Sequence, residues 1–182
     1  GRTPAAGRGG ARGGTLAGVQ DEPITAVHTR LVEWLAAEGV AARQVEHAPT
    51  RTSEESAAAR GEPLAVGGKA LLLRVGDEEF ELFVFSAARR LDSAAIRRAL
   101  GIRHLRFATA EELRERTGLV PGSVPPFGPP VLPFRLNVDP SVLEQDRIAF
   151  NAGMLTRSLV LAIAEYQRIA RPARVFAFTT AG

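Results

Sequence analysis

Lys69 is the one lysine in a chain of 182 residues whose other cationic side chains are 22 arginines. Lysine carries a compact point charge on a flexible stem, whereas arginine carries a planar fork of fixed geometry. We therefore expect that position 69 requires the point charge of a lysine and that an arginine cannot replace it. Lys69 also follows Gly67-Gly68 and opens a run of leucines, so the alternative is a surface lysine at the start of a strand.

Two further segments have backbones suited to ligand contact. Residues 119–130 are rich in proline and glycine and have little capacity for regular structure. Glycine leaves such a stiff loop open, so N–H groups near Gly122 and Gly128 can face a ligand carbonyl or phosphate. The segment Asn151-Ala152-Gly153 has small residues that permit close approach of a ligand or a second backbone. An ordinary connector and an ordinary turn are the alternatives.

Other kinds of chemistry have little support in the sequence. No catalytic triad, Walker motif or paired-carboxylate pattern occurs. The chain has no cysteine, and His28, His47 and His104 lack the spacing of metal ligands, so we expect no metal and no cofactor. A set of arginines is suited to a nucleic-acid backbone, with a solvated helix face as the alternative. This set comprises Arg89, Arg90, Arg97, Arg98, Arg103 and Arg106.

The distribution of charge and apolar residues limits the partners. The net charge of +3 arises within the first 20 residues, which contain three arginines and no acid, so the remaining chain is balanced. No uninterrupted apolar stretch approaches the roughly 20 residues of a membrane span. We expect a soluble, cytoplasmic protein with neither a membrane nor DNA as its partner. The length suits one core, and we expect a disordered Gly/Arg-rich tail over 1–22, one domain over 23–171 and a C-terminal tail over 172–182.

The elements that position these residues follow from periodicity and capping signals. Helical spacing begins at Ile24, and Thr52 and Thr109 each open a capping box ahead of a further helix. Asp92 caps another helix through Leu100. The remaining predictions are strands at 40–47, 67–75, 80–86, 105–107, 131–138, 147–151 and 159–163, and a short helix at 164–169.

The arrangement of strands indicates the fold class. Residues 67–75 and 80–86 are joined by Gly76-Asp77-Glu78-Glu79, which predicts a β-hairpin. Both runs are apolar at consecutive positions, which is typical of strands covered on both faces. Helices and strands mix without strict alternation. We predict an α+β fold, a single compact domain with a curved mixed β-sheet flanked by helices.

The order of the motifs resembles the YbaK/prolyl-tRNA-synthetase-associated editing domain family over about Ile24 to Ile169. The resemblance lies in His47-x-Pro49-x-x-Thr52-Ser53-x-Glu55, Gly68-Lys69-Ala70-Leu71-Leu72-Leu73, Gly118-x-x-x-Gly122-x-x-x-Pro126-Phe127-Gly128 and Phe150-Asn151-Ala152-Gly153. It implies a YbaK-like α+β domain that acts as a trans-editing hydrolase on mischarged aminoacyl-tRNA. The free ribose hydroxyl of the substrate is implied to help activate the attacking water.

The resemblance also implies roles for individual residues. Lys69 matches the lysine that holds the terminal adenosine, and Gly122 matches the glycine whose backbone lines the aminoacyl pocket. Pro126, Phe127 and Gly128 are implied to shape the same wall, and Gly153 matches a small residue beside it. Thr52, Ser53 and Asn151 complete the candidate substrate-binding set.

The implied substrate is a small amino acid such as cysteine or alanine, with tRNA-Pro as the expected carrier and prolyl-tRNA synthetase as a possible partner. Members specialised for alanine have Asn where this chain has Ala70 and His where it has Asn151. The alternative function is a non-catalytic module that binds an aminoacyl-adenosine end or a synthetase. The absence of a triad is compatible with hydrolysis, because an aminoacyl ester is already activated and positioning supplies much of the acceleration.

Overall fold

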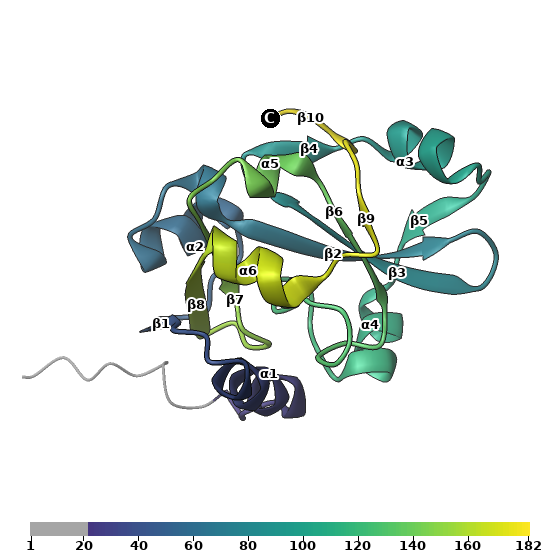
Figure 1. Ribbon diagram of the computed structural model, residues 1–182. Coiled ribbons are helices and arrows are strands. Elements are labelled where there is room, and N and C mark those ends of the chain that lie inside the picture. The colour runs from purple at the N-terminus through teal and green to yellow at the C-terminus, as the bar shows by residue number, and fades with distance from the viewer. Residues whose placement is uncertain (1–21) are drawn as a thin grey trace, which may run out of the picture.

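The hairpin predicted from the leucine run forms the centre of the structure, a computed structural model that describes residues 22–182 (Figure 1). Strand β2 (Gly68–Val75) pairs antiparallel with β3 (Glu79–Ser86), and Lys69 stands opposite Phe85. Residues 1–21, which include nearly all of the expected N-terminal tail, lie outside the described residues. Within the described part, no helix is long and apolar enough to cross a membrane.

The strands form three sheets, and the five-stranded one has the mixed character that we expected. The largest is mixed, in the order β5-β2-β3-β6-β9, because β6 runs parallel to both β3 and β9. An antiparallel sheet β1-β8-β7 continues from it through an isolated parallel bridge between Gly67 and Ala149. The remaining strands are β1 (Arg43–Glu46), β4 (Arg89–Leu91), β5 (Leu105–Phe107), β6 (Arg135–Val138), β7 (Arg147–Asn151), β8 (Arg157–Ala162), β9 (Arg174–Val175) and β10 (Thr179–Ala181).

Helices cover these sheets, which confirms the α+β class. They are α1 (Ala26–Ala37), α2 (Ser53–Arg60), α3 (Ser93–Leu100), α4 (Ala110–Thr117), α5 (Pro140–Leu143) and α6 (Ile163–Ala170), with a 3-10 turn at Leu64–Val66. Thr109 and Glu112 form a reciprocal capping box. At α2 the Thr52 hydroxyl accepts from Glu55 N as predicted, but the Glu55 carboxylate accepts from Arg51 N, one residue earlier than expected.

Strand β3 contributes to two cores at once. Leu82 and Val84 lie in the larger apolar cluster, whereas Phe83 and Phe85 lie in a second cluster with Phe178. Successive side chains of a strand point to opposite faces, so apolar residues at every position predict burial on both sides. The structure confirms this prediction, and the rigid hairpin fixes the position of Lys69 at its end.

The predicted strand over 131–138 is shorter than expected. Regular pairing begins only at Arg135, because Val131 and Leu132 both direct their N–H groups back to the carbonyl of Gly128. Pro133 in this segment lacks the N–H that a sheet ladder requires. The Pro/Gly loop that begins at residue 119 therefore extends to residue 134.

The expected C-terminal tail over 172–182 is wrong, because these residues complete the fold. Strand β9 joins the edge of the main sheet beside β6, and β10 pairs with β4 (Figure 1). Between them Phe178 is fully buried, and its N–H donates to the Asp139 carboxylate at 2.8 Å. The apolar residues Val175 to Phe178 thus serve as core and sheet rather than as an appendage.

Phe178→Ala is expected to lower the free energy of unfolding by about 3–5 kcal/mol, because it leaves a cavity beside Phe83 and Phe85. Urea denaturation of this variant and of Val175→Ala, whose side chain is 49% exposed, provides the comparison. The valine variant should change stability by less than about 1 kcal/mol. Equal effects of the two changes would contradict the packing described for the C-terminus.

Candidate active site

A pocket of about 700 Å³ lies where α2, the start of β2, the Pro/Gly loop and the end of β7 meet. Five of the nine residues that we singled out from the sequence line it. These are Thr52, Ser53, Lys69, Gly122 and Asn151. Four segments that are separated in the sequence therefore contribute to one concave surface.

Lys69 stands at the mouth of this pocket. Its side chain is exposed, and its Nζ lies 5.9 Å from the centroid of the Phe85 ring. Within residues 22–182 it forms no ion pair with a carboxylate, whereas many of the arginines do. A Cβ on the preceding Gly68 would stand 2.5 Å from Ile148 Cδ1, so glycine there lets β2 approach β7 closely. Lys69 is thus a cation placed by a rigid strand and left available to a ligand.

Gly122 forms part of the pocket wall through its backbone. Its φ of +87° is in the region that glycine adopts most readily. Its carbonyl accepts from Asn151 Nδ2 at 2.8 Å, and the adjacent Ser123 carbonyl accepts from Gly153 N at 2.9 Å. Within the described residues, the N–H of Gly122 makes no hydrogen bond. The loop is therefore held in place, with one backbone donor left free at the pocket.

A buried polar network lies behind Asn151. Arg60 donates through Nη2 to Asn151 Oδ1 at 3.0 Å and through Nε to Ser158 Oγ at 2.8 Å. His47 Nε2 lies 2.7 Å from the same hydroxyl. Burial lowers the pKa of Arg60 to about 10, and the negative charge of Glu62 acts in the opposite direction. Arg60 therefore remains charged at neutral pH, although only 8% of it is exposed.

Thr52 and Ser53 bring the start of α2 to the pocket. The Thr52 hydroxyl is occupied as a cap, since it accepts from Glu55 N at 3.1 Å. The N-terminus of a helix carries partial positive charge, which adds to the field of Lys69. Arg51 and Glu54 also line this side, where the two cations Arg51 and Lys69 outnumber the one carboxylate, which suits an anionic or oxygen-rich ligand. Within residues 22–182, no group of three or more His, Cys, Asp or Glu side chains could hold a metal ion.

The other four predicted site residues do not line this pocket. Phe127 is fully buried and packs edge-on against Trp34 and Phe150, and the Pro126 carbonyl accepts from the Tyr166 hydroxyl. Gly128 lies against the carbonyl of Phe134, and Gly153 lies beneath the start of α1. The expectation that Pro126, Phe127, Gly128 and Gly153 shape the pocket wall is therefore corrected. They anchor the two loops from the core side.

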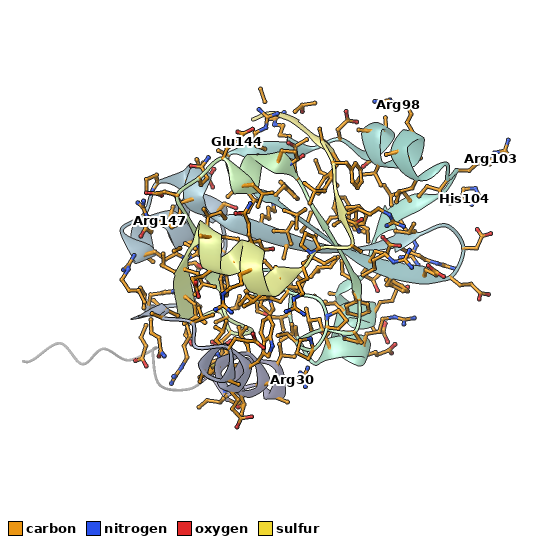
Figure 2. All side chains as sticks on the ribbon, viewed as in Figure 1. Arg30, Arg98, Arg103, His104, Glu144 and Arg147 are labelled. Atoms are coloured by element: carbon orange, nitrogen blue, oxygen red, sulfur yellow. The ribbon has the colours of Figure 1, made fainter. Side chains whose placement is uncertain are left out.

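The arginine set does not gather at the pocket either. Arg98 and Arg103 project outward at the end of the molecule formed by α3 and β5, and in this view α2 lies on the opposite side (Figure 2). Arg106 is engaged by both carboxylate oxygens of Glu112. For this set, the solvated-face interpretation fits the structure better than a track leading into the site.

A family model described as the aminoacyl-tRNA editing domain matches residues 47–169, more than half of the chain. The chain belongs to the aminoacyl-tRNA editing domain family. This confirms the resemblance drawn from the motifs. The matched segment contains every residue of the pocket, from α2 to the loop after β7. The chemistry of this editing domain is therefore the hydrolysis of an aminoacyl ester, and the domain is an aminoacyl-tRNA deacylase.

The editing domain is similar to two curated proteins, both named Multifunctional Ser/Thr-tRNA deacylase ProXp-y, from Escherichia coli strain K12 and Escherichia coli O157:H7. Each is 37% identical over 150 residues, which cover 80% of this chain and 89% of the relative. Among solved structures, one described as a candidate trans-editing enzyme for prolyl tRNA synthetase is 28% identical, with a TM-score of 0.72. The match covers 88% of this chain and 100% of that one.

A second crystal structure, of a hypothetical protein, is 26% identical to the editing domain, with a TM-score of 0.73. That match covers 83% of this chain and 99% of the other. Both structures are matched over nearly their whole length, so the similarity extends to the complete fold and not to the pocket alone.

Sequence reasoning missed two polar residues of this editing domain, Arg60, which contributes to the pocket lining, and Ser158, which lies behind it. Arg60 is one of 22 arginines, and its position at the end of a helix resembles that of a solvated cation. Ser158 lies in a strand with no catalytic motif around it. Gly61 predicts that α2 ends after Arg60, but it does not indicate that the Arg60 side chain is buried.

Proposed function

We propose that this editing domain removes small, hydroxyl-bearing amino acids, serine and threonine in the first place, from the 3′ end of mischarged tRNA. The observation that carries the proposal is that, among residues 22–182, a Lys69 without an ion-pair partner, a Gly122 N–H without a hydrogen bond and the Asn151 amide line one pocket. A cation suits the phosphate or ribose oxygens of the terminal nucleotide, and a backbone donor suits the carbonyl oxygen of the aminoacyl ester. The name of the curated relatives supports the choice of amino acid.

Each residue of the pocket has a role in the proposal. Lys69 anchors the terminal nucleotide at the pocket mouth, where its flexible stem can reach a phosphate or ribose oxygen. The N–H of Gly122 donates to the ester carbonyl, and this contact strengthens as negative charge develops on that oxygen. Thr52 and Ser53 border the nucleotide side at the positive end of α2.

Hydrolysis then needs only water and the substrate. The water oxygen attacks the ester carbonyl carbon, and the bond between that carbon and the ribose oxygen breaks. The proton lost by the water ends on the ribose oxygen, and the free ribose hydroxyl next to it assists the transfer. The products are the amino acid and a deacylated tRNA. The protein contributes position and charge stabilisation rather than a dedicated base.

Asn151 provides the basis for a preference for hydroxyl groups. Its amide nitrogen has two protons, of which one is bound to the Gly122 carbonyl. The second is available to the oxygen of a substrate side chain. Alanine offers no acceptor there and leaves the donor unpaired, and a thiol is a weak acceptor. We therefore rank serine and threonine as better substrates than cysteine or alanine on tRNA-Pro, which was the narrower expectation from the resemblance.

A panel of seryl-, threonyl-, alanyl- and cysteinyl-tRNA, each prepared on tRNA-Pro and on one unrelated tRNA, tests the proposal. We expect kcat/KM for serine to exceed that for alanine by about 10- to 100-fold, the factor that corresponds to one hydrogen bond to a polar donor. A preference for alanine or cysteine on both tRNAs would contradict the assignment of the amino acid. If only the tRNA-Pro forms react, the acceptor or a prolyl-tRNA synthetase partner determines selectivity.

A further inference from the structure

Burial of the charged Arg60 side chain costs the folded state free energy. Arg60 is buried and charged, and within residues 22–182 it forms no ion pair, because the nearby Glu62 is engaged by Arg43 and Arg147. A buried charge without an opposite partner costs free energy, whereas an apolar side chain of similar volume would not. Stability alone does not account for an arginine at this position. An explanation for the arginine must therefore come from a contact that only a guanidinium can make.

The hydrogen bonds of Arg60 determine the orientation of the Asn151 amide. The guanidinium has only donors, so Nη2 requires the Asn151 oxygen to face it. The Asn151 nitrogen then faces the opposite side, where it donates to the Gly122 carbonyl. A reversed amide would set two donors against each other at Arg60 and two oxygens against each other at Gly122. The direction of the Asn151 N–H groups is therefore imposed from behind by Arg60.

Ser158 and His47 hold the guanidinium itself. Ser158 Oγ accepts from Arg60 Nε, and its single proton is shared between two acceptors, His47 Nε2 and Asn151 Oδ1. His47 Nδ1 lies 2.9 Å from the Ala48 carbonyl, which fits the tautomer that carries the proton on Nδ1 and leaves Nε2 to accept. The planar fork of Arg60 is thus fixed at Nε and Nη2 together, an arrangement that lysine cannot reproduce.

We propose that Arg60 is a positioning residue, which acts through Asn151 to hold the Gly122 peptide group and to direct the second Asn151 N–H into the pocket. The proposal rests on the proposed function for its kinetic consequence. Its structural consequence, a Gly122 loop ordered by Arg60, stands independently of the reaction. Arg60 lines the pocket, but its proposed role is to orient Asn151 and not to contact the ester or the attacking water.

A double-mutant cycle tests the dependence on Asn151. Arg60→Met and Asn151→Ala are each expected to lower kcat/KM for seryl-tRNA by about 10- to 100-fold and to remove the preference for serine over alanine. The double variant should be no more than about threefold below the worse single variant, since both changes break one chain of contacts. Multiplication of the two single effects would overturn the proposal. Arg60→Lys should recover only part of the loss.

Arg174→Met is the matched control, because Arg174 also binds an asparagine, Asn137, but on β9 and outside the pocket lining. This variant is expected to lose stability, because Arg174 also pairs with Glu81, yet its ratio of serine to alanine hydrolysis should equal that of the wild type. Equal loss of the serine preference in both arginine variants would show a general effect of stability and overturn the proposal.

Hydrogen exchange over residues 119–124 supplies a readout that needs no activity. Arg60→Met and Asn151→Asp should both accelerate exchange there, because the aspartate can pair with Arg60 but cannot donate to the Gly122 carbonyl. Arg174→Met should leave exchange in this segment unchanged. Unchanged exchange in Arg60→Met would overturn the proposal even if the wild-type protein hydrolyses seryl-tRNA. Accelerated exchange in a protein without deacylase activity would support Arg60 and reject the proposed function.

Discussion

Lys69→Ala is expected to lower kcat/KM for release of the amino acid at least about 100-fold, the scale seen when one positioned donor to a reacting substrate is removed. The cation at the pocket mouth has no ion-pair partner among the described residues, so its charge is available to the terminal nucleotide. The side chain is exposed, so the free energy of unfolding should change by less than about 0.5 kcal/mol. Single-turnover deacylation and urea denaturation measure the two effects.

Two further variants isolate the cause. Lys69→Arg keeps the charge but replaces the point charge by a larger planar fork, and we expect it to remain about tenfold below the wild type. Arg103→Ala removes an exposed cation at the far end of the molecule and should not change the rate (Figure 2). If Lys69→Ala retains more than half of the wild-type kcat/KM, Lys69 is only a surface residue at a strand start.

Gly122→Ala is expected to reduce deacylation by about 100-fold, because a small displacement of a donor at the reacting carbonyl has an effect of that size. An alanine at a φ of +87° is strained, and its Cβ would stand 3.6 Å from Leu155 Cδ2 inside the pocket. The backbone can relieve this strain only by rotating the peptide groups of the loop. The single-turnover rate with seryl-tRNA measures the loss.

Gly76→Ala is the matched control for Gly122→Ala. Gly76 also has a positive φ, +66°, but lies in the turn between β2 and β3, and a Cβ there meets nothing within 4 Å. Both variants should lose about 1 kcal/mol of stability from backbone strain, and only Gly122→Ala should lose activity. Rates within threefold of each other would mean that the Gly122 backbone is not part of the reaction.

Local chemistry made much of the fold predictable. Thr52, Asp92 and Thr109 each accept a hydrogen bond from the backbone at the start of the helix that follows, as their positions in the sequence predict. The unbroken apolar run of β3 likewise predicts burial on two faces. In these cases the signal and its structural consequence lie within a few residues, so tertiary contacts had little opportunity to override them.

The parts that escaped prediction depend on contacts between distant segments. Strands β9 and β10 contain two and three residues, too few for any periodic signal, and they form because Phe178 enters a core built by β3. The sequence placed Phe127 beside Gly122 but could not tell which face of the loop it occupies. Its burial against Trp34 and Phe150 decides that question.

Part of the candidate site was predicted from the sequence, and part was missed. Gly122 was identified because glycine in a proline-rich loop indicates an unusual backbone conformation. Lys69 was identified because it is the one lysine in a chain that otherwise uses arginine. His47 belongs to the motif that carries the resemblance, but Arg60 and Ser158 left no such sign, since they are ordinary residues that meet His47 only after α2 packs against β7 and β8. Their effect on Asn151 becomes visible only through hydrogen-bond directions.

The measurement that tests the central claim most directly is multiple-turnover release of serine from seryl-tRNA by the purified wild-type protein. We expect the amount of serine released to exceed the amount of protein many times over, at a rate that Lys69→Ala lowers at least about 100-fold. Saturable binding of seryl-tRNA with release no faster than spontaneous hydrolysis would contradict it. The pocket would then belong to a module that binds the aminoacylated end without cleaving it.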